Sequence, residues 1–293
     1  MRFILSILLI SFSFNQVFSA YDYLGTRATA MSGAVTSGNS IESGIFHNPA
    51  QLSNSTDKSI ISGHSNLYGL EFLTLSHIGI LMKNYSINFE KISTEYGGNS
   101  LSSETTFGIA RGVNLYKDRQ SMIQMGVRLN SYNYKFGKTA GTEGDGSNGM
   151  SLGSGSAAGF DIGFQGVLNK KYFVAYYLQN IISYSEGSNL GQNLPETISI
   201  GISYLPYKDL TTSLDINQLS GNKDSEIRFG IEYKLMESLT IRTGLQSNPN
   251  RFSGGFEFGN IKLATLYNFN FSYSFLTHHV LPTTHQFSIQ VKF

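Results

Sequence analysis

The carboxy-terminal stretch His-Gln-Phe-Ser-Ile-Gln-Val-Lys-Phe, residues 285–293, alternates polar and apolar side chains without a break. Successive side chains of a β-strand point to opposite faces, so this stretch predicts a strand with one apolar and one polar face. The apolar face carries Phe287, Ile289, Val291 and Phe293, and the polar face carries Gln286, Ser288, Gln290 and Lys292. A soluble sheet could bury the apolar face in its core, whereas a membrane barrel would turn it toward lipid.

An apolar strand that ends the chain on an aromatic residue suits a barrel. The pattern resembles the carboxy-terminal signal, ending in Phe, by which bacterial outer-membrane barrels are recognised for assembly. The resemblance implies outer-membrane lipid and the β-barrel assembly machinery as partners. It implies an assembly signal formed by Phe287, Ile289, Val291 and Phe293.

The composition of the 293-residue chain excludes several other classes of protein. With a net charge of +1 and no local run of Lys or Arg, the chain lacks the basic excess expected of a protein that binds nucleic acid. The sequence contains no Cys, which excludes disulfides and zinc-thiolate sites. The mean hydropathy of -0.12 is that of a soluble protein, but lipid-facing and lumen-facing residues cancel in the average over a barrel strand.

The first 19 residues predict a secretory signal peptide. Arg2 precedes an apolar run, and cleavage after Ser19 fits best, because cleavage after Ala20 would place Phe18 where a small residue is needed. A membrane-anchor helix is the alternative, although the run is short for a spanning helix. No later stretch of about 20 apolar residues occurs, so we expect no transmembrane helix in the mature protein.

Residues 20–56 do not alternate as a strand does. They contain many small residues, which let a backbone pack closely, and Pro49, which lacks an N–H donor and biases Asn48 away from helix. We therefore expect a compact, bent chain that packs inside another structure, and in a barrel this chain would be an internal plug. The alternative is that Asn48, Pro49 and Ala50 only form a turn leading into the first strand, and the two interpretations are compatible.

Two motifs in this region resemble a superfamily of outer-membrane barrels that contains the long-chain fatty acid transporter FadL and the type IX secretion proteins PorV and PorQ. Its members carry a Gly-x-Arg-Ala-x-x-Met-x-Gly-Ala-like opening and a downstream Asn-Pro-Ala. The matching residues are Gly25, Arg27, Ala28, Met31, Gly33, Ala34, Asn48, Pro49 and Ala50. Relatives often carry paired acidic residues between the motifs, whereas this chain has the single carboxylate Glu42. This departure puts a charge-based role for the connecting loop in doubt.

From residue 57 onward, alternation with a period of two recurs and predicts fourteen strands. The number is even, as single-chain bacterial barrels require, and most strands have about the 9 to 11 residues that a tilted membrane strand needs, or somewhat more. The predicted strands are residues 57–66, 70–82, 85–95, 104–116, 120–136, 157–168, 172–183, 196–205, 210–219, 225–235, 239–247, 251–258, 261–270 and 284–293. Alternation is weak between residues 59 and 82. We expect residues 57–293 to form an all-β, transmembrane antiparallel β-barrel.

The lengths of the connections give independent support, because such barrels have short periplasmic turns and longer outside loops. With the carboxy terminus in the periplasm, the predicted periplasmic turns are residues 83–84, 117–119, 169–171, 206–209, 236–238 and 259–260. The predicted outside loops are residues 67–69, 96–103, 137–156, 184–195, 220–224, 248–250 and 271–283. The outside loops are mostly longer, as this topology requires.

Charged residues within the strands fall on the face that alternates with the apolar residues, and this face would line the lumen. They include Arg128, Arg228, Glu232, Arg242 and Glu257. With the amino terminus in the periplasm, residues 20–56 can fold up into the lumen, where Arg27 and Asn48 can hydrogen-bond the polar inner faces. The residues predicted to form the plug are Gly25, Arg27, Met31, Gly33, Asn48, Pro49 and Ala50.

The sequence lacks the patterns that mark common catalytic and cofactor sites. It has no Gly-x-Ser-x-Gly in a strand-to-helix setting, no His-Glu-x-x-His, and no Gly-rich phosphate loop followed by Lys and Ser or Thr. His278 and His279 are adjacent, so on an extended strand they point to opposite sides and cannot easily share one metal ion. The Gly-rich run of residues 137–147 has too few carboxylates for a calcium loop. We expect no enzyme activity, no cofactor and no metal.

The sequence therefore predicts a non-enzymatic outer-membrane barrel of a Gram-negative bacterium. The resemblance implies either a role in type IX secretion, with secretion-system proteins as partners, or passive uptake of hydrophobic small molecules such as fatty acids. The longest loop has almost no apolar residue between Gly137 and Gly149 to serve as a landing site, and the chain lacks the large insertions of fatty acid transporters. These two features favour the secretion role. A soluble secreted β-protein or adhesin is a further alternative.

Overall fold

The structure is a computed structural model that describes residues 21–293, except for residues 22, 57, 140, 143, 145–147, 188–193, 221–223 and 264–266. The predicted signal peptide, residues 1–19, lies outside the described residues. The helices are short: α1 (Thr26–Ala30), α2 (Ile41–Phe46) and the 3-10 helices η1 (Pro49–Asn54) and η2 (Leu67–Gly69). Among the described residues, no helix has the length and apolar character that crossing a membrane requires.

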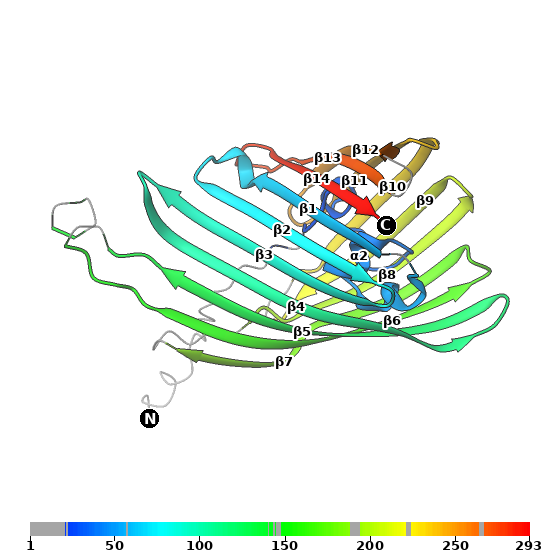
Figure 1. Cartoon of the computed structure of the whole chain (residues 1–293), viewed down its shortest axis with the longest axis horizontal. Coiled ribbons are helices and arrows are strands. Elements are labelled where there is room, and N and C mark those ends of the chain that lie inside the picture. Colours follow the sequence, from blue (N-terminus) through cyan, green and yellow to red (C-terminus); the bar gives the residue numbers. More distant parts are fainter. Residues whose placement is uncertain are drawn as a thin grey trace, which may run out of the picture.

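Within the described part of the chain, fourteen strands form one closed antiparallel barrel. They are β1 (Lys58–Asn66), β2 (Leu73–Met82), β3 (Tyr85–Tyr96), β4 (Asn99–Lys117), β5 (Ser121–Phe136), β6 (Ser154–Leu168), β7 (Tyr172–Gly187), β8 (Thr197–Tyr207), β9 (Leu210–Leu219), β10 (Glu226–Met236), β11 (Leu239–Gln246), β12 (Arg251–Leu263), β13 (Tyr267–Leu276) and β14 (Thr284–Lys292). Each strand pairs with its neighbours in sequence, and β14 returns to pair with β1 (Figure 1). The predicted fold class and strand number are confirmed.

The carboxy-terminal strand closes the barrel with the face pattern that its sequence predicts. In the pairing of β14 with β1, Phe287 lies opposite His64 and Ile289 opposite Ser62. Phe287 and Ile289 are exposed on the outer surface, whereas the alternating residues Gln286 and Ser288 of the same strand are buried on the inside.

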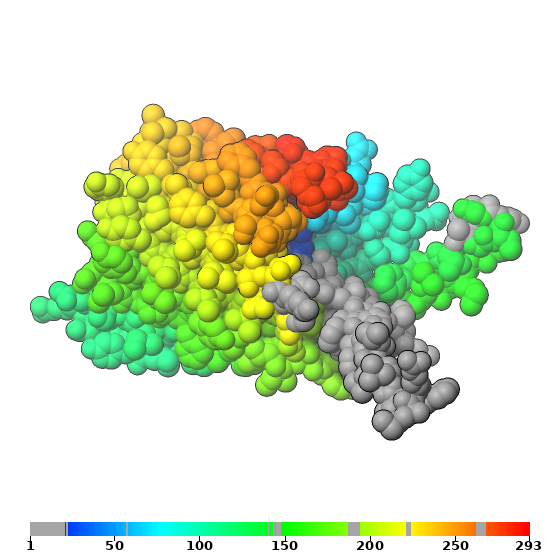
Figure 2. Space-filling view, turned by 180° about the vertical axis from the view of Figure 1, so that it is seen from behind, coloured from blue at the N-terminus to red at the C-terminus, as the bar shows by residue number. Residues whose placement is uncertain are grey.

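The outer surface of the barrel is largely apolar, because most strands turn their apolar positions away from the lumen. In β8, Ile200 and Ile202 are exposed, whereas Ser199 and Ser203 are buried. Figure 2 shows the continuous wall that β8 to β12 form, coloured from green to orange. A continuous band of exposed apolar side chains requires an apolar surrounding, so the fold is that of a transmembrane barrel.

The wall of the barrel is not equally high all round. β4 has 19 residues and β5 has 16, whereas β9 has 10 and β11 has 8. The hairpin of β5 and β6 therefore reaches far beyond the neighbouring strands at the end of the barrel that carries the outside loops (Figure 1).

One predicted turn is wrong. Gly259 and Asn260 form a dipeptide that is typical of turns, yet both lie inside β12, and β13 begins only at Tyr267. The register between β12 and β13 shifts at this point, and Asn260 has a φ of 58°, so the two residues form a bulge in the strand. Because β13 starts later than predicted, it continues to Leu276 and shortens the predicted loop of residues 271–283.

The predicted loop of residues 96–103 is also shorter in the structure. β3 continues to Tyr96 and β4 begins at Asn99, which leaves Gly97 and Gly98 as the connection. These two glycines have φ values of 58° and 80°, the left-handed conformations that a two-residue hairpin turn requires. The serine-rich residues that follow belong to the extended part of β4.

The weak alternation between residues 59 and 82 has a structural reason. On the inner face of β2, Leu75 and Leu81 are fully buried. Leu81 belongs to an apolar cluster that also contains Ile45 and Phe46 of α2. Since both faces of β2 carry apolar residues, its sequence does not show the polar inner face of the other strands.

We predict that Ile202→Arg, at the middle of β8, destabilises the folded barrel by about 2–4 kcal/mol, because a cation near the bilayer midplane loses its hydration. Ile202 is 51% exposed on the outer face. Tyr207→Arg at the end of the same strand should cost about 0–1 kcal/mol, because the bilayer interface lies close to water. Urea unfolding in lipid vesicles measures both variants, and equal destabilisation would contradict the position of the lipid-facing band.

Candidate functional site

The described residues of the range 21–56, hereafter the N-terminal segment, lie inside the barrel (Figure 1). α1 contacts β11 to β14, whereas η1 contacts β4 to β6 on the opposite wall. α2 contacts β2 and β3 and packs against η1. The N-terminal segment therefore spans the lumen from wall to wall.

The N-terminal segment also runs along the axis of the barrel. The Asn54 side chain accepts hydrogen bonds from Asn114 and Lys117, at the end of the barrel where β14 ends. Tyr21 borders a cavity with Glu104 and Tyr132, which lie toward the other end. The described chain thus begins in the half of the lumen that carries the outside loops and reaches the periplasmic end at β1. This direction corrects the expectation that the segment folds up from the periplasm.

Asn48 and Pro49 shape the connection between α2 and η1. The Asn48 side chain accepts a hydrogen bond from Ala50 N at 3.0 Å, which caps η1, and donates one to Thr36 O at 2.9 Å. Pro49 occupies the start of η1, where a missing N–H has no consequence. Asn48 therefore stabilises the fold of the segment itself, and the expectation that it hydrogen-bonds side chains of the barrel is wrong.

Arg27 in α1 joins the N-terminal segment to a chain of ion pairs on the barrel wall. Its Nε lies 3.0 Å from the carboxylate of Glu232 in β10, and its Nη1 donates to the Ser43 hydroxyl in α2. Arg242 in β11 contacts Glu232 at 2.6 Å and Glu257 in β12 at 2.7 Å. Because positive and negative groups alternate along this chain, each charge has an opposite neighbour where α1 excludes water.

Arg128 in β5 binds the carboxy-terminal end of α2. Its guanidinium donates to the backbone oxygens of Gly44, Ile45 and Phe46 at 3.1, 2.7 and 3.1 Å. These carbonyls have no intrahelical partner at a helix end. The Asp161 carboxylate of β6 lies 3.8 Å from the guanidinium and balances its charge. Arg128 is 3% exposed, so the N-terminal segment supplies much of its polar environment.

The loop between α1 and α2 is bound by polar side chains of two further strands. Thr36 N donates to the Asp215 carboxylate of β9 at 2.8 Å. The Gln165 amide of β6 accepts from Gly38 N at 3.0 Å and donates to Gly38 O at 2.9 Å. The wall therefore binds the backbone of the N-terminal segment as well as its side chains.

Glycines on the inner face let the N-terminal segment approach the wall closely. Gly112, Gly126 and Gly163 are direct neighbours across β4, β5 and β6. A Cβ added at Gly126 would overlap the backbone of Pro49 and Ala50, so the close approach of η1 requires glycine at this position.

On the opposite wall, Met31 and Gly33 of the N-terminal segment also lie close against residues of the barrel. Met31 is fully buried over Gly230 and Gly244, which face each other across β10 and β11. Gly33 has a φ of 80°, a conformation that favours glycine, and a Cβ there would overlap the guanidinium of Arg228. The lumen is thus shaped to the N-terminal segment on two sides.

Arg228 also lies beside Tyr23 of the N-terminal segment. The guanidinium carbons of Arg228 and of Arg251 in β12 each lie 5.4 Å from the centroid of the Tyr23 ring, a cation-π geometry. Arg228 forms an ion pair with Glu226 at 2.5 Å.

All the charged residues predicted to face the lumen are on the inner face: Arg128, Arg228, Glu232, Arg242 and Glu257.

Gly25 and Glu42 connect α1 to α2. Gly25 precedes α1 with a φ of 89°, and a Cβ there would overlap the Glu42 side chain. The Glu42 carboxylate accepts a hydrogen bond from Arg27 N at 2.9 Å. Burial raises the pKa of Glu42 to about 7, although the nearby charge of Arg242 opposes this shift. Glu42, the single carboxylate between the two sequence motifs, therefore stabilises the fold of the segment.

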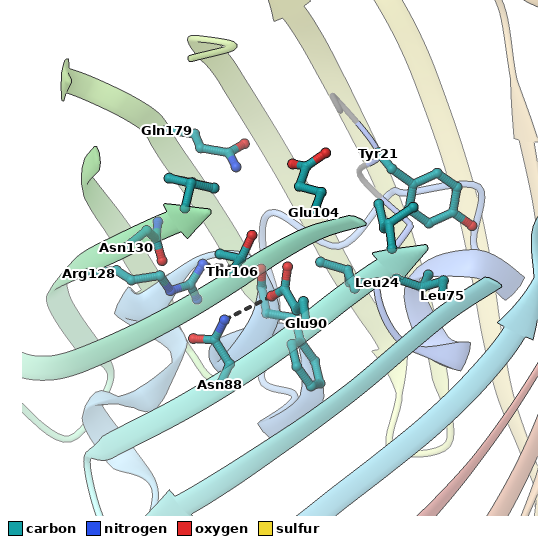
Figure 3. A pocket seen from close by; sticks show the side chains of 13 residues that line it. Tyr21, Leu24, Leu75, Asn88, Glu90, Glu104, Thr106, Arg128, Asn130 and Gln179 are labelled. Carbon is teal, nitrogen blue, oxygen red and sulfur yellow. Dashed lines mark hydrogen bonds between the residues drawn. The ribbon is translucent and has the colours of Figure 1, made fainter. Parts of the chain in front are cut away.

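A cavity lies between the N-terminal segment and the wall of β2 to β7, in the half of the lumen near the outside loops (Figure 3). Its volume of about 60 Å³ is enough for a few water molecules. Glu90, Glu104 and Arg128 contribute charged groups to the lining. A second cavity, of about 40 Å³, shares the lining residue Tyr21.

The described residues offer no site for a metal ion, because no three or more His, Asp or Glu side chains among them gather in a suitable group. The rings of His278 and His279 lie 4.4 Å apart in the loop after β13, and His278 Nδ1 accepts hydrogen bonds from Val280 N and Leu281 N. The Gly-rich run of residues 137–147 lies partly outside the described residues.

Several residues that bind the N-terminal segment or line the cavity did not stand out in the sequence: Glu90, Glu104, Asp161, Gln165 and Asp215. The alternation places Glu90, Asp161 and Gln165 on the polar face of their strands. Nothing in a local pattern, however, distinguishes an inner residue that binds the segment from one that faces water.

Solved structures of outer-membrane transporters share this fold. The toluene transporter TbuX of Ralstonia pickettii aligns with a TM-score of 0.57 at 13% identity, over 93% of this chain and 98% of that one. The toluene transporter TodX of Pseudomonas putida aligns with a TM-score of 0.58 at 11% identity, over 94% and 98% of the two chains. A FadL homologue of Pseudomonas aeruginosa aligns with a TM-score of 0.54 at 10% identity, over 92% and 98%.

No protein-family model matches the sequence, and no curated protein matches it. The chain has the fold of the FadL-type outer-membrane barrels, and the resemblance to FadL is confirmed at this level. The resemblance to PorV and PorQ stays a prediction.

We predict that Gly126→Leu displaces η1 from the wall, because the new side chain would occupy the position of the Pro49 backbone. Limited trypsin digestion should then cleave after Arg27, which is buried in the native protein, at least about tenfold faster, because displacement exposes it. The matched control is Gly166→Leu, on the outer face of β6, where the nearest atom to an added Cβ is 3.9 Å away. Equal protection of Arg27 in both variants would show that the close fit at Gly126 does not hold the segment.

Proposed function

We propose that the protein is a passive channel of the outer membrane in which the N-terminal segment acts as the plug. The observation that carries this proposal is the N-terminal segment itself, which is hydrogen-bonded to opposite walls of a closed barrel. A transport function is supported by the fold, which is shared with structures described as toluene transporters and a FadL homologue. The chain would reach the outer membrane of a Gram-negative bacterium after cleavage of residues 1–19.

The dimensions of the lumen support a closed state. The cavities beside the N-terminal segment have volumes of about 60 and 40 Å³. A cavity of about 150 Å³ holds a molecule such as benzene. Neither of these two cavities, both lined by described residues, therefore admits a solute of that size unless the N-terminal segment moves.

The contacts of the N-terminal segment support its movement as a unit. They include hydrogen bonds and ion pairs to the side chains of Arg128, Gln165, Asp215 and Glu232, beside the apolar cluster of α2 with Leu81. A hydrogen bond to a charged group contributes about 1.5–3 kcal/mol net, so the segment moves only where water enters and replaces these bonds. Movement of the segment leaves the strand-to-strand hydrogen bonds intact, so the barrel persists while the lumen opens.

Secretion and uptake remain distinct candidates for the direction of transport. The likeness to structures described as toluene transporters supports transport of a small molecule. A type IX secretion role rests on the motif resemblance through Gly25 to Ala34 and Asn48 to Ala50, and it stays a prediction.

We predict that deletion of residues 22–50 raises the single-channel conductance in planar bilayers, because the lumen of a barrel this wide leaks when nothing fills it. Heat-modifiable migration on a denaturing gel shows whether the barrel still assembles. Equal conductance of an assembled barrel with and without these residues would reject the plug and leave the Asn48 to Ala50 stretch as a turn.

A disulfide between the N-terminal segment and the wall should hold the channel closed. The hydroxyls of Ser37 and Ser203 are 2.7 Å apart, and the chain contains no Cys, so S37C with S203C introduces one defined cross-link. The matched control links Ser203 to Ser213 within the wall, where the hydroxyls are 2.8 Å apart. Uptake of arabinose by liposomes should fall in the first variant, recover with reductant, and stay unchanged in the control. Unchanged uptake in the cross-linked first variant would contradict movement of the segment.

A further inference from the structure

We infer that the outer surface of β14, β1, β2 and β3 binds a phosphate-bearing lipid of the outer leaflet, with Lys91 and His64 on the phosphate group and an acyl chain in a hollow beside them. These four strands lie side by side at the seam where the barrel closes (Figure 1). The inference concerns the lipid-facing surface and does not depend on the proposed channel function.

The hollow, hereafter the seam hollow, has a volume of about 520 Å³ and lies where β14 meets β1 and β2. Ser62 of β1 is placed between Ile78 of β2 and Ile289 of β14. The same row of outer-face residues continues with Phe89 of β3 and Phe271 of β13. A small side chain between larger ones leaves a depression in the surface. Its volume lies within the range of about 300–1,000 Å³ that is typical of pockets for small molecules.

The next row of outer-face residues, toward the outside loops, is polar. Lys91 of β3 lies opposite Ser76 of β2, and Ser76 lies opposite His64 of β1. All three side chains are exposed. The row continues with Thr105 of β4 and Asn133 of β5. On this side of the barrel the apolar band therefore ends between the seam hollow and Lys91, which places Lys91 and His64 where lipid headgroups begin.

Lys91 and His64 can bind one phosphate group together. Among the described residues, no carboxylate forms an ion pair with Lys91. Neighbouring strands are about 4.8 Å apart, so the Cα atoms of these two residues, two strands apart, are separated by about 10 Å. Both side chains reach a phosphate above Ser76, which lies between them.

The His64 ring is oriented for this contact. Its Nδ1 lies 2.9 Å from the Ser76 hydroxyl. When Ser76 donates this hydrogen bond, the hydrogen of the neutral ring is on Nε2, which can donate to a phosphate oxygen. A hydrogen bond or ion pair to a phosphate is charge-assisted and therefore stronger than one between neutral groups.

The combination of an apolar hollow and a cationic border selects a lipid. A neutral hydrocarbon could fill the seam hollow, but it would leave Lys91 without a counter-ion. A free phosphate ion could pair with Lys91, but it would leave the Phe89 and Phe287 side chains of the hollow uncovered. A lipid that carries a phosphate above an acyl chain contacts both parts at once.

Tryptophan fluorescence tests the inference, because the chain contains no Trp. F287W places a reporter at the seam hollow, and F229W places a matched reporter on another part of the outer wall. Both positions are the fourth residue from the outside end of their strands, β14 and β10. The purified full-length barrel is reconstituted in phosphatidylcholine vesicles that contain either brominated phosphatidic acid or brominated phosphatidylcholine, which quench Trp fluorescence on contact.

At F287W, phosphatidic acid should bind at least about fivefold more strongly than phosphatidylcholine, because each Lys near a membrane surface attracts an anionic lipid to about this extent. At F229W the ratio should be close to one. Adding K91Q/H64Q to F287W should lower its ratio to that of F229W. The matched control, K135Q/H279Q added to F287W, removes an exposed Lys and an exposed His elsewhere and should keep the ratio of F287W.

Equal ratios for F287W and F229W would overturn the inference without any charge variant. An unchanged ratio in an assembled K91Q/H64Q barrel, verified by heat-modifiable migration, would also overturn it. The same would follow if K135Q/H279Q lowered the ratio equally, since net charge would then explain the preference. Inorganic phosphate added to the vesicles should leave the ratio unchanged, and loss of the preference would indicate a site for the free ion instead of a lipid.

Discussion

A strand in a bilayer must satisfy its backbone hydrogen bonds within the protein, and in this chain the pairing of β1 with β14 meets that requirement. Closure gives the sheet an inner and an outer surface. Because successive side chains alternate between these two surfaces, every second residue of a strand faces the lumen. A closed sheet of fourteen strands is too wide for its own side chains to fill. The N-terminal segment occupies the space that results.

The walls and the N-terminal segment complement each other in two ways. Glycines such as Gly126 and Gly230 admit backbone and side chains of the segment where any larger residue would overlap them. Charged residues such as Arg128 and Glu232 meet carbonyl groups or an opposite charge of the segment. Charges are costly away from water unless they are paired and hydrogen-bonded, so the segment and the inner wall depend on each other for their polar partners.

Strand number and the inner position of Arg128 or Glu232 could be predicted, because a period of two depends only on neighbouring residues. The bulge at Asn260 could not, since a Gly-Asn pair suits both a turn and a bulge, and pairing with β13 decides between them. Asn48 and Asp215 show the same limit for the site. Both are polar and both are buried, but only the three-dimensional arrangement shows that one caps η1 and the other binds Thr36 N.

The separation in sequence between the N-terminal segment and its binding surface has a consequence for biogenesis. The hydroxyls of Thr26 and Ser288 are 2.9 Å apart although 262 residues separate them, and Arg27 binds Glu232 across 205 residues. The N-terminal segment, which is synthesised before the strands, therefore has no complete partner until the last strand has joined the sheet. The segment therefore completes its folding at the end of assembly. A segment in its final position indicates a barrel in which β14 has paired with β1.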